Sequence, residues 1–241
     1  MGNSDEIQTP KGIFAAGDTA LHLSYYIGNY KGGRNESCMY GVDTERVWYD
    51  VDLKSAYTTA MAHMGLPSYK RARLVSTKFV EEMSTKDLLN GYLILNAKFE
   101  FPVEIKYPSI PCYVDSTTTV YPLFGKSLLT GPEYLLAKNQ GCKIVIKSAF
   151  YIPQSEEVIK TVGGVKIKRV IKPFHSIIKD IQEKRREYPK GHILNLLYKE
   201  MGNSIYGNLV RGMSNKRSFD PKSGRTIRMT ATELSNPILA S

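Results

Sequence analysis

The sequence contains no long hydrophobic run and few cysteines. No apolar stretch in its 241 residues reaches 18 residues, so we expect no membrane-spanning helix. The opening MGNSDEIQTP has no apolar signal-peptide core, which predicts an intracellular protein that is not secreted. The three cysteines, Cys38, Cys112 and Cys142, are odd in number and far apart. They predict buried thiols and argue against a disulfide framework or a zinc site.

Repeats and linkers are also missing, whereas basic residues are concentrated in one region. No internal repeat or low-complexity tract divides the chain, so any domains are expected to be interwoven. The net charge is +10, and residues 160–228 hold 17 Lys and Arg against 5 Asp and Glu, whereas the remainder holds 16 against 18. This basic region suits a polyphosphate or nucleic-acid partner, although a solvated, solubilising face explains it as well.

Alternating and helical spacings predict an α+β fold. Arg46 to Leu53, RVWYDVDL, alternate as in a β-strand. Ser55 follows as the expected N-cap of a short helix that ends near Met64. The other expected elements are β-rich sequence over 91–125, a helix from Thr130 to about Gly141, a strand over 142–152, and a helical hairpin with a basic tip over 173–209.

The second helix of that hairpin contains YKEMGNSIYG, residues 198–207, whose polar face is unusual. At the α-helical ~100° per residue, Lys199, Asn203 and Tyr206 fall within an arc of about 60°. A cation, an amide and a phenol therefore replace the solvated charges of an ordinary amphipathic helix, and we predict a binding site on this face. The opposite side of the helix carries the apolar residues Leu194, Leu197, Met201 and Ile205.

Two carboxylates, Asp50 and Asp52, share one face of the expected strand and come directly before a helix start. Hard oxygen ligands of this kind can hold Mg²⁺ together with substrate phosphates. An isolated Asp-x-Asp pair is more often part of an exposed strand face. A metal nuclease that uses both aspartates is a further alternative, but it would leave the polar helix face unexplained.

Two segments in combination carry a family resemblance. Residues 52–57, DLKSAY, resemble the first polymerase motif of family B DNA polymerases, and residues 199–207, KEMGNSIYG, resemble the second, K-x-x-x-N-S-x-Y-G, at every defined position. Residues 30–33, YKGG, resemble the Y-x-G-G segment that precedes the first motif in the protein-primed subgroup. The resemblance implies a polymerase palm with a mixed or antiparallel sheet, plus fingers made of a helical hairpin.

The resemblance also implies an activity, namely a DNA-templated DNA polymerase that adds deoxynucleotides to a primer 3′ end by two-metal phosphoryl transfer. Asp52 would ligate Mg²⁺, or Mn²⁺ in its place, and Tyr57 would stack under the nucleotide sugar and exclude a 2′-hydroxyl. Lys199, catalytic together with Asp52, would hold the nucleotide phosphates. Asn203 and Tyr206 would line the nascent base-pair pocket.

Further cationic and glycine positions follow from the same resemblance. Arg185 is preferred over Arg186 as the residue of the first fingers helix that receives the triphosphate. The positions expected to bind DNA are Tyr30, Gly32, Gly33, Arg34 and Gly207. The expected partners are primer-template DNA, a deoxynucleoside triphosphate and a terminal protein primer, with no membrane. A polymerase of a virus, phage or mobile element would work in the host cytoplasm or nucleus, or at a viral replication site.

The resemblance divides the chain into four regions. These are a palm start with the first motif over 1–78, a β-rich palm-associated insertion over 79–160, the fingers over 161–209 and a return to the palm over 210–241.

The sequence also departs from the family pattern. A third motif, Tyr-x-Asp-Thr-Asp, which supplies the second metal-binding carboxylate, is absent, and only Asp220 and Glu233 are acidic after Gly207. One carboxylate does not suffice for two metal ions, so the chain as given is expected to be an inactive polymerase fragment. Ala56 and Thr58 stand where the family has leucine and proline. The alternative function is a non-catalytic module that binds primer-template or single-stranded DNA with a polymerase-like surface.

Overall fold

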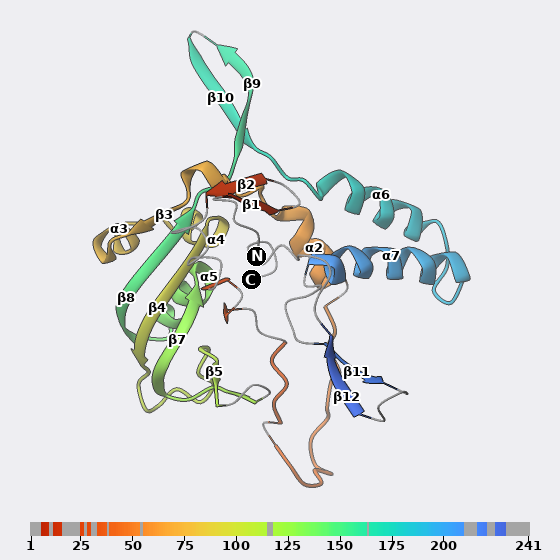
Figure 1. Cartoon of the computed structure of the whole chain (residues 1–241). Coiled ribbons are helices and arrows are strands. Elements are labelled where there is room, and N and C mark those ends of the chain that lie inside the picture. The colour runs from red at the N-terminus through yellow and green to blue at the C-terminus, as the bar shows by residue number, and fades with distance from the viewer. Residues whose placement is uncertain are drawn as a thin grey trace.

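A computed structural model gives the chain an α+β architecture, as predicted, in which a β-sheet with its helices lies beside a group of three further helices (Figure 1). The structure describes residues 6–9, 12–15, 25–26, 28–29, 33–37, 39–53, 55–114, 118–162, 164–209, 216–220 and 225–229. The predicted positions Tyr30 and Gly32 lie outside these ranges.

The sheet is antiparallel, with the strand order β3–β8–β4–β7. Its strands are β3 (Arg73–Val75), β4 (Tyr92–Glu100), β7 (Phe124–Thr130) and β8 (Lys143–Ile152). Alternation along β4 places Leu93, Leu95, Ala97 and Phe99 on one face, where all four are buried. Burying a side chain as large as Leu95 stabilises the fold by about 1.5–3 kcal/mol, so this face forms the main core.

Helices cover that face. They are α3 (Thr77–Glu81), α4 (Thr85–Asn90) and α5 (Gly131–Asn139), and they contribute Val80, Leu88 and Tyr134 to the core. α5 begins as the sequence predicts, because Thr130 and Glu133 form a capping box: the Thr130 side chain accepts from the Glu133 backbone N–H, and Glu133 accepts from the Thr130 backbone N–H.

Half of the opposite face is covered by the segment around Tyr26. The Tyr26 ring packs edge-on against Phe150 at 6.0 Å, and Ile94 and Ile152 complete this smaller core. The Tyr26 hydroxyl donates to the Tyr92 carbonyl oxygen at 2.9 Å, and the Tyr92 hydroxyl donates to the Gly65 carbonyl oxygen at 2.5 Å. The two phenols therefore tie the chain on either side of the first motif to the sheet.

The second group consists of α2 (Ala56–His63), α6 (His175–Arg186) and α7 (Ile193–Leu209). α6 and α7 form the predicted helical hairpin, and both contact α2. Ile178 and Ile181 are the buried residues of α6, whereas the apolar Ile177 beside them is 48% exposed.

Short elements complete the fold. They are the 3₁₀ turn η1 (Tyr69–Arg71), the paired strands β1 (Glu6–Thr9) with β2 (Gly12–Ala15), β5 (Cys112–Tyr113) with β6 (Thr119–Val120), β9 (Glu156–Val162) with β10 (Val165–Val170), and β11 (Lys216–Asp220) with β12 (Arg225–Met229). Among the helices that the structure describes, none has the length and hydropathy needed to cross a membrane.

The cysteine prediction holds in part. Cys142 is buried, and burial raises the pKa of its thiol, as expected for an inert core cysteine. Cys112 is only half-buried, and Cys38 lies outside the described residues.

One local prediction is wrong, and another holds in part. Residues 46–53 form no strand, because none of the strands in the described ranges pairs with them. Their apolar side chains are not buried either: Val47, Tyr49 and Val51 are 78%, 83% and 84% exposed. Alternation alone does not make a strand without a hydrogen-bonding neighbour. Ser55 occupies the predicted N-cap position of α2, and its carbonyl oxygen accepts from the Thr59 backbone N–H at 2.9 Å, but its backbone is left-handed (φ 59°) and its side chain makes no capping hydrogen bond.

The phenol of Tyr26 makes the fold sensitive to alkaline pH. Burial and the neighbouring Tyr92 and Tyr69 raise the pKa of Tyr26 well above its usual value, and burial also raises the pKa of Tyr92. A phenol whose pKa is raised on folding contributes fully below its unfolded pKa of about 10, and this stability is lost at higher pH.

We expect Tyr26→Phe to lower the free energy of unfolding by about 1 kcal/mol near neutral pH, because the hydrogen bond to Tyr92 is lost. The deficit should shrink above about pH 10, because phenylalanine cannot ionise. Urea unfolding of both proteins over a pH series measures this difference. A deficit that stays constant with pH would contradict the assignment.

Candidate functional site

A cavity of about 980 Å³ lies between α2 and the hairpin of α6 and α7. Residues from chain positions about 150 apart meet there. Five of the residues singled out from the sequence line it, namely Asp52, Tyr57, Arg185, Lys199 and Asn203. The polar face of the second hairpin helix is therefore directed toward the first motif, and the structure brings the two motifs into one site.

The two helices approach closely at Gly202 and Thr58. Both residues are buried, and a Cβ added at Gly202 would lie 3.0 Å from Thr58 Cγ2. The Thr58 hydroxyl donates to the Ser55 carbonyl oxygen at 3.0 Å, which keeps its methyl group turned toward α7. This contact explains why a glycine is needed inside α7, where it costs about 1 kcal/mol in helix propensity.

Arg185 crosses from the hairpin to the first motif. Its Nη1 donates to Ser55 Oγ at 3.4 Å, and its Nε donates to Asn195 Oδ1 at 3.2 Å. Asn195 Nδ2 donates in turn to the backbone oxygens of Arg185 and Tyr188, at 3.1 and 2.8 Å. Asn195 therefore fixes both the hairpin turn and the arginine.

Sequence reasoning missed Asn195 and the contact that Ser55 makes with Arg185. Asn195 precedes Lys199 by four residues and lies on the same helical face, so the projection that found the polar face could have included it. Ser55 stands within the first motif, but its contact with Arg185 spans 130 positions and depends on how the hairpin folds back. No local pattern reports that contact.

The cavity is strongly cationic. Arg185, Arg186, Lys190 and Lys199 line it, and Asp52 is the one carboxylate among the described lining residues. Four cations against one carboxylate favour a polyanionic ligand such as a triphosphate. Arg186 lines the cavity as well. Within the described residues, Arg185 donates a hydrogen bond to the first motif and Arg186 does not.

A pair of tyrosines closes one side of the site. Tyr57 stacks on Tyr206 with ring centroids 4.6 Å apart and an interplanar angle of 26°. Tyr57 lines the cavity, whereas Tyr206 supports it from behind. A Cβ added at Gly33 would lie 3.7 Å from the Tyr57 hydroxyl, so Gly33, the last residue of the segment that resembles Y-x-G-G, lies beside this pair.

Asp52 is exposed at the edge of the cavity, at the end of the unpaired segment 39–53. Asp50 is exposed too but does not line the cavity. The two aspartates therefore do not face the cavity as a pair. Within the described ranges, no three His, Cys, Asp or Glu side chains gather as a metal cluster. Asp52 can offer oxygen ligands to one Mg²⁺ that arrives on a phosphate, but it cannot hold two ions alone.

The remaining predicted DNA contacts lie apart from the cavity. Arg34 has local partners: it pairs with Glu36, donates to the Pro108 carbonyl oxygen at 2.9 Å and stacks 3.9 Å over the Tyr121 ring. Gly207 is exposed near the end of α7, and a Cβ there would meet nothing within 4 Å. Neither residue is brought to the cavity by the structure.

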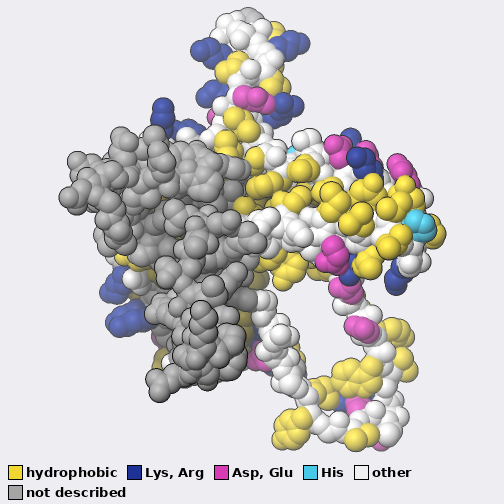
Figure 2. Space-filling model, turned by 45° about the vertical axis from the view of Figure 1, so that its right-hand side comes forward, with side chains coloured by type: hydrophobic (Ala, Val, Ile, Leu, Met, Phe, Trp, Pro, Cys, Tyr) yellow, Lys and Arg dark blue, Asp and Glu magenta, His cyan; other side chains and the backbone are white. Residues whose placement is uncertain are grey.

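The apolar side of α7 faces outward. Leu197 and Met201 are 50% and 44% exposed, and the apolar side chains along the hairpin are visible in Figure 2. The helix therefore directs its polar face inward.

The comparisons with known proteins point to a polymerase. The chain is 31% identical over 221 residues to the primer-independent DNA polymerase PolB of Escherichia coli, a match that covers 92% of the chain. The chain spans about a quarter of the length of that relative (24%). No protein-family model and no solved structure matches the chain. By this similarity the chain is related to a DNA polymerase.

The contact between Gly202 and Thr58 is testable by a double-mutant cycle. In the wild-type background, Gly202→Ala should gain little or lose stability, because the new methyl group meets Thr58 Cγ2 at 3.0 Å. In a Thr58→Ser background, which keeps the hydroxyl and removes Cγ2, the same change should recover up to about 1 kcal/mol of helix propensity.

Gly207→Ala is the matched control, since it makes the same change in α7 where a Cβ meets nothing within 4 Å. Its effect should be equal in both backgrounds. Urea unfolding supplies the free energies of all the variants. If Gly202→Ala has the same effect with threonine as with serine at position 58, the contact does not constrain the helices.

Proposed function

We propose that this chain forms the nucleotide-binding palm and fingers of a DNA polymerase that extends a primer 3′ end on a DNA template. The observation that carries the proposal is the single cavity shared by Asp52, Tyr57, Arg185, Lys199 and Asn203. The resemblance of both motifs to those of family B polymerases supports it, as does the similarity to a protein named as a DNA polymerase.

Each group has a role in this proposal. Lys199 and Arg185 bind the triphosphate, because cations with several donors neutralise phosphate charge. The Tyr57 ring, braced by Tyr206 at 4.6 Å, lies against the sugar and excludes a 2′-hydroxyl. Asn203 faces the new base pair. Asp52 would hold a Mg²⁺ ion that the nucleotide carries, and such an ion would supply Lewis-acid stabilisation of the phosphate charge.

The nucleotide-binding part of the proposal can be tested on the chain itself. A complementary deoxynucleotide with Mg²⁺ should tighten binding to primer-template DNA by about tenfold or more, and Lys199→Ala should abolish this tightening. Lys179→Ala is the control, since Lys179 lies on the same hairpin, pairs with Glu183 at 3.7 Å and does not line the cavity. Fluorescence anisotropy with labelled DNA measures both. Equal tightening in all three proteins would sink the assignment.

The catalytic part needs a second carboxylate. In a longer protein that supplies it, Asp52→Asn should reduce Mg²⁺-dependent nucleotide addition by at least a hundredfold, roughly 3 kcal/mol in the barrier. Asp50→Asn should leave the rate nearly unchanged, because Asp50 does not line the cavity. Primer extension on a gel gives both rates. A loss of less than tenfold in Asp52→Asn would refute its role as a metal ligand.

A binding module without chemistry remains the second candidate, because Asp52 is the one carboxylate among the described cavity residues. Such a module would bind primer-template or single-stranded DNA in a salt-sensitive manner. It would show no tightening with the complementary nucleotide, so the anisotropy experiment separates the two functions.

The mode of initiation belongs to the proposal as well. The segment that resembles Y-x-G-G favours the protein-primed subgroup, whereas the relative is named primer-independent. The comparison gives no support to a terminal protein primer. Synthesis on a circular single-stranded template without primer or added protein would favour a start that needs neither.

A further inference from the structure

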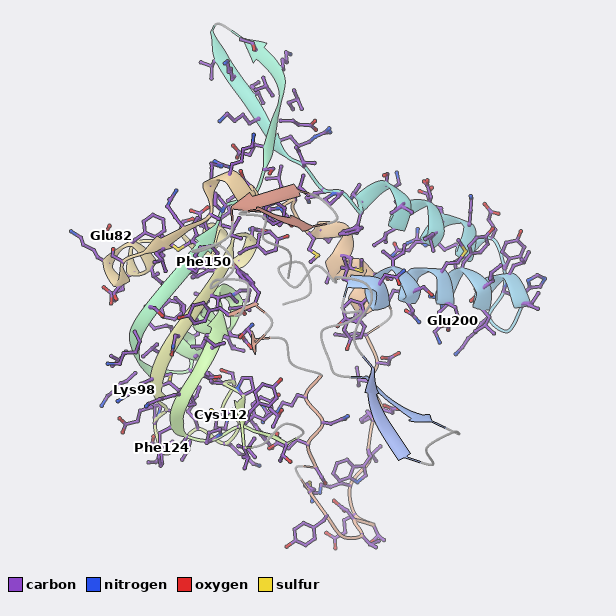
Figure 3. All side chains as sticks on the ribbon, in the orientation of Figure 1. Glu82, Lys98, Cys112, Phe124, Phe150 and Glu200 are labelled. Carbon is purple, nitrogen blue, oxygen red and sulfur yellow. The ribbon has the colours of Figure 1, made fainter. Side chains whose placement is uncertain are left out.

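One end of the sheet face opposite the helices is exposed and rich in lysine. Lys98 on β4 pairs in register with Lys126 on β7 and with Val145 on β8. The next row along the strands consists of Glu100, Phe124 and Lys143. Figure 3 shows Lys98 and Phe124 at this same end of the sheet.

The pairing of Lys98 with Lys126 is unfavourable for the fold. Two like charges directly opposite on neighbouring strands repel each other, because the strands are only about 4.8 Å apart. Neither lysine has an ion pair with any residue in the described ranges. A carboxylate at either position would relieve the repulsion.

Exposed apolar and basic side chains surround this pair. Phe124 is 73% exposed and Val145 is 56% exposed. Lys143 is exposed in the next row, and Lys147, the extra residue of a bulge in β8, is exposed as well. Glu100 is the acidic residue of the two rows. The face therefore joins several cations to an accessible aromatic ring.

We propose that this lysine face, made of Lys98, Lys126, Lys143 and Phe124, binds single-stranded DNA. The lysines neutralise backbone phosphates and the Phe124 ring stacks with a base, which is the combination that single-strand binding surfaces use. The choice of DNA as the polyanion rests on the proposed function, but the anion-binding character of the face does not. The phosphates of the DNA would supply the negative charge that Lys98 and Lys126 lack from residues in the described ranges.

The position of the face supports this partner. On this face of β7, the residue next to Lys126 is Leu128. Leu128 is covered by Gly28, since a Cβ at Gly28 would lie 3.3 Å from Leu128 Cδ1. Gly33 follows Gly28 by five residues, and a Cβ at Gly33 would lie 3.7 Å from the Tyr57 hydroxyl at the cavity. A strand of DNA on the lysine face would thus lie next to Gly28, a few residues before a residue that neighbours the cavity.

Charge reversal separates binding from stability. Lys126→Glu and Lys98→Glu should each raise the melting temperature by about 1–3 °C, because an opposite-charge pair replaces a like-charge pair. Each should also weaken binding of labelled oligo(dT) by roughly three- to tenfold at low salt and reduce the salt slope by about 1. The double variant restores repulsion between like charges, so its melting temperature should return toward the wild type while oligo(dT) affinity falls further.

Controls make the result specific. Lys86→Glu places the same charge change on α4, which covers the other face of the sheet, and should leave oligo(dT) binding unchanged. Phe124→Ala should weaken binding of oligo(dT) by about tenfold, because base stacking is lost. Lys179→Ala, on α6 outside the cavity, should leave binding of oligo(dT) unchanged. The measurement contains no nucleotide and no Mg²⁺, so a failure of the proposed nucleotide site is distinguishable from a failure of the lysine face.

Unchanged oligo(dT) affinity in the Lys98 and Lys126 variants would overturn the proposal. Weakened binding that is confined to a blunt duplex would also overturn it and assign the face to double-stranded DNA. If Lys86→Glu weakened oligo(dT) binding as much as Lys98→Glu does, the loss would come from the change in net charge. That result would also overturn the proposed site.

Discussion

The close approach of α7 to α2 at Gly202 and Thr58 is the contact on which the candidate site depends. A Cβ at Gly202 would lie only 3.0 Å from Thr58 Cγ2, so any side chain there would separate the two helices. Lys199 and Asn203 flank Gly202 on the same side of α7, and they reach the cavity because the backbone comes this near. A cavity of about 980 Å³ lined from both motifs therefore follows from the absence of one side chain.

Beyond that point, α6 is held by its buried Ile178 and Ile181, whereas α7 is held mainly by polar contacts. Leu197 and Met201 remain 50% and 44% exposed, so the hydrophobic effect contributes little to the orientation of α7. Arg185 and Asn195 supply the alternative: their hydrogen bonds join the turn, both hairpin helices and Ser55. An arginine already fixed by neighbours loses less conformational entropy when it binds a phosphate. The arrangement favours binding at a modest cost in stability.

Much of this could be read from the sequence, since the helix starts and the polar face are local patterns. The segment from Thr130 to about Gly141 was predicted as a helix and forms α5, and helical spacing identified the hairpin and the polar face that carries Lys199. Long-range pairing could not be read. Residues 46–53 alternate like a strand, yet no strand in the described ranges lies beside them, and Ser55 meets Arg185 only because the hairpin folds back over 130 positions. Local patterns fix what a segment can form, and tertiary partners decide whether it forms.

The two ends of the cavity differ in how firmly they are held. The cationic end is built on two packed helices and a hydrogen-bonded turn, so its charges are in place before any ligand arrives. Asp52 follows a segment whose Val47, Tyr49 and Val51 are exposed on the order of four-fifths and which lacks a partner strand in the described ranges. A metal ligand must keep its oxygens within a few tenths of an ångström to serve catalysis. In the proposed function, binding of phosphate would need only the cationic end, whereas placement of the metal would need a neighbour that pairs with residues 46–53 and holds Asp52 in position.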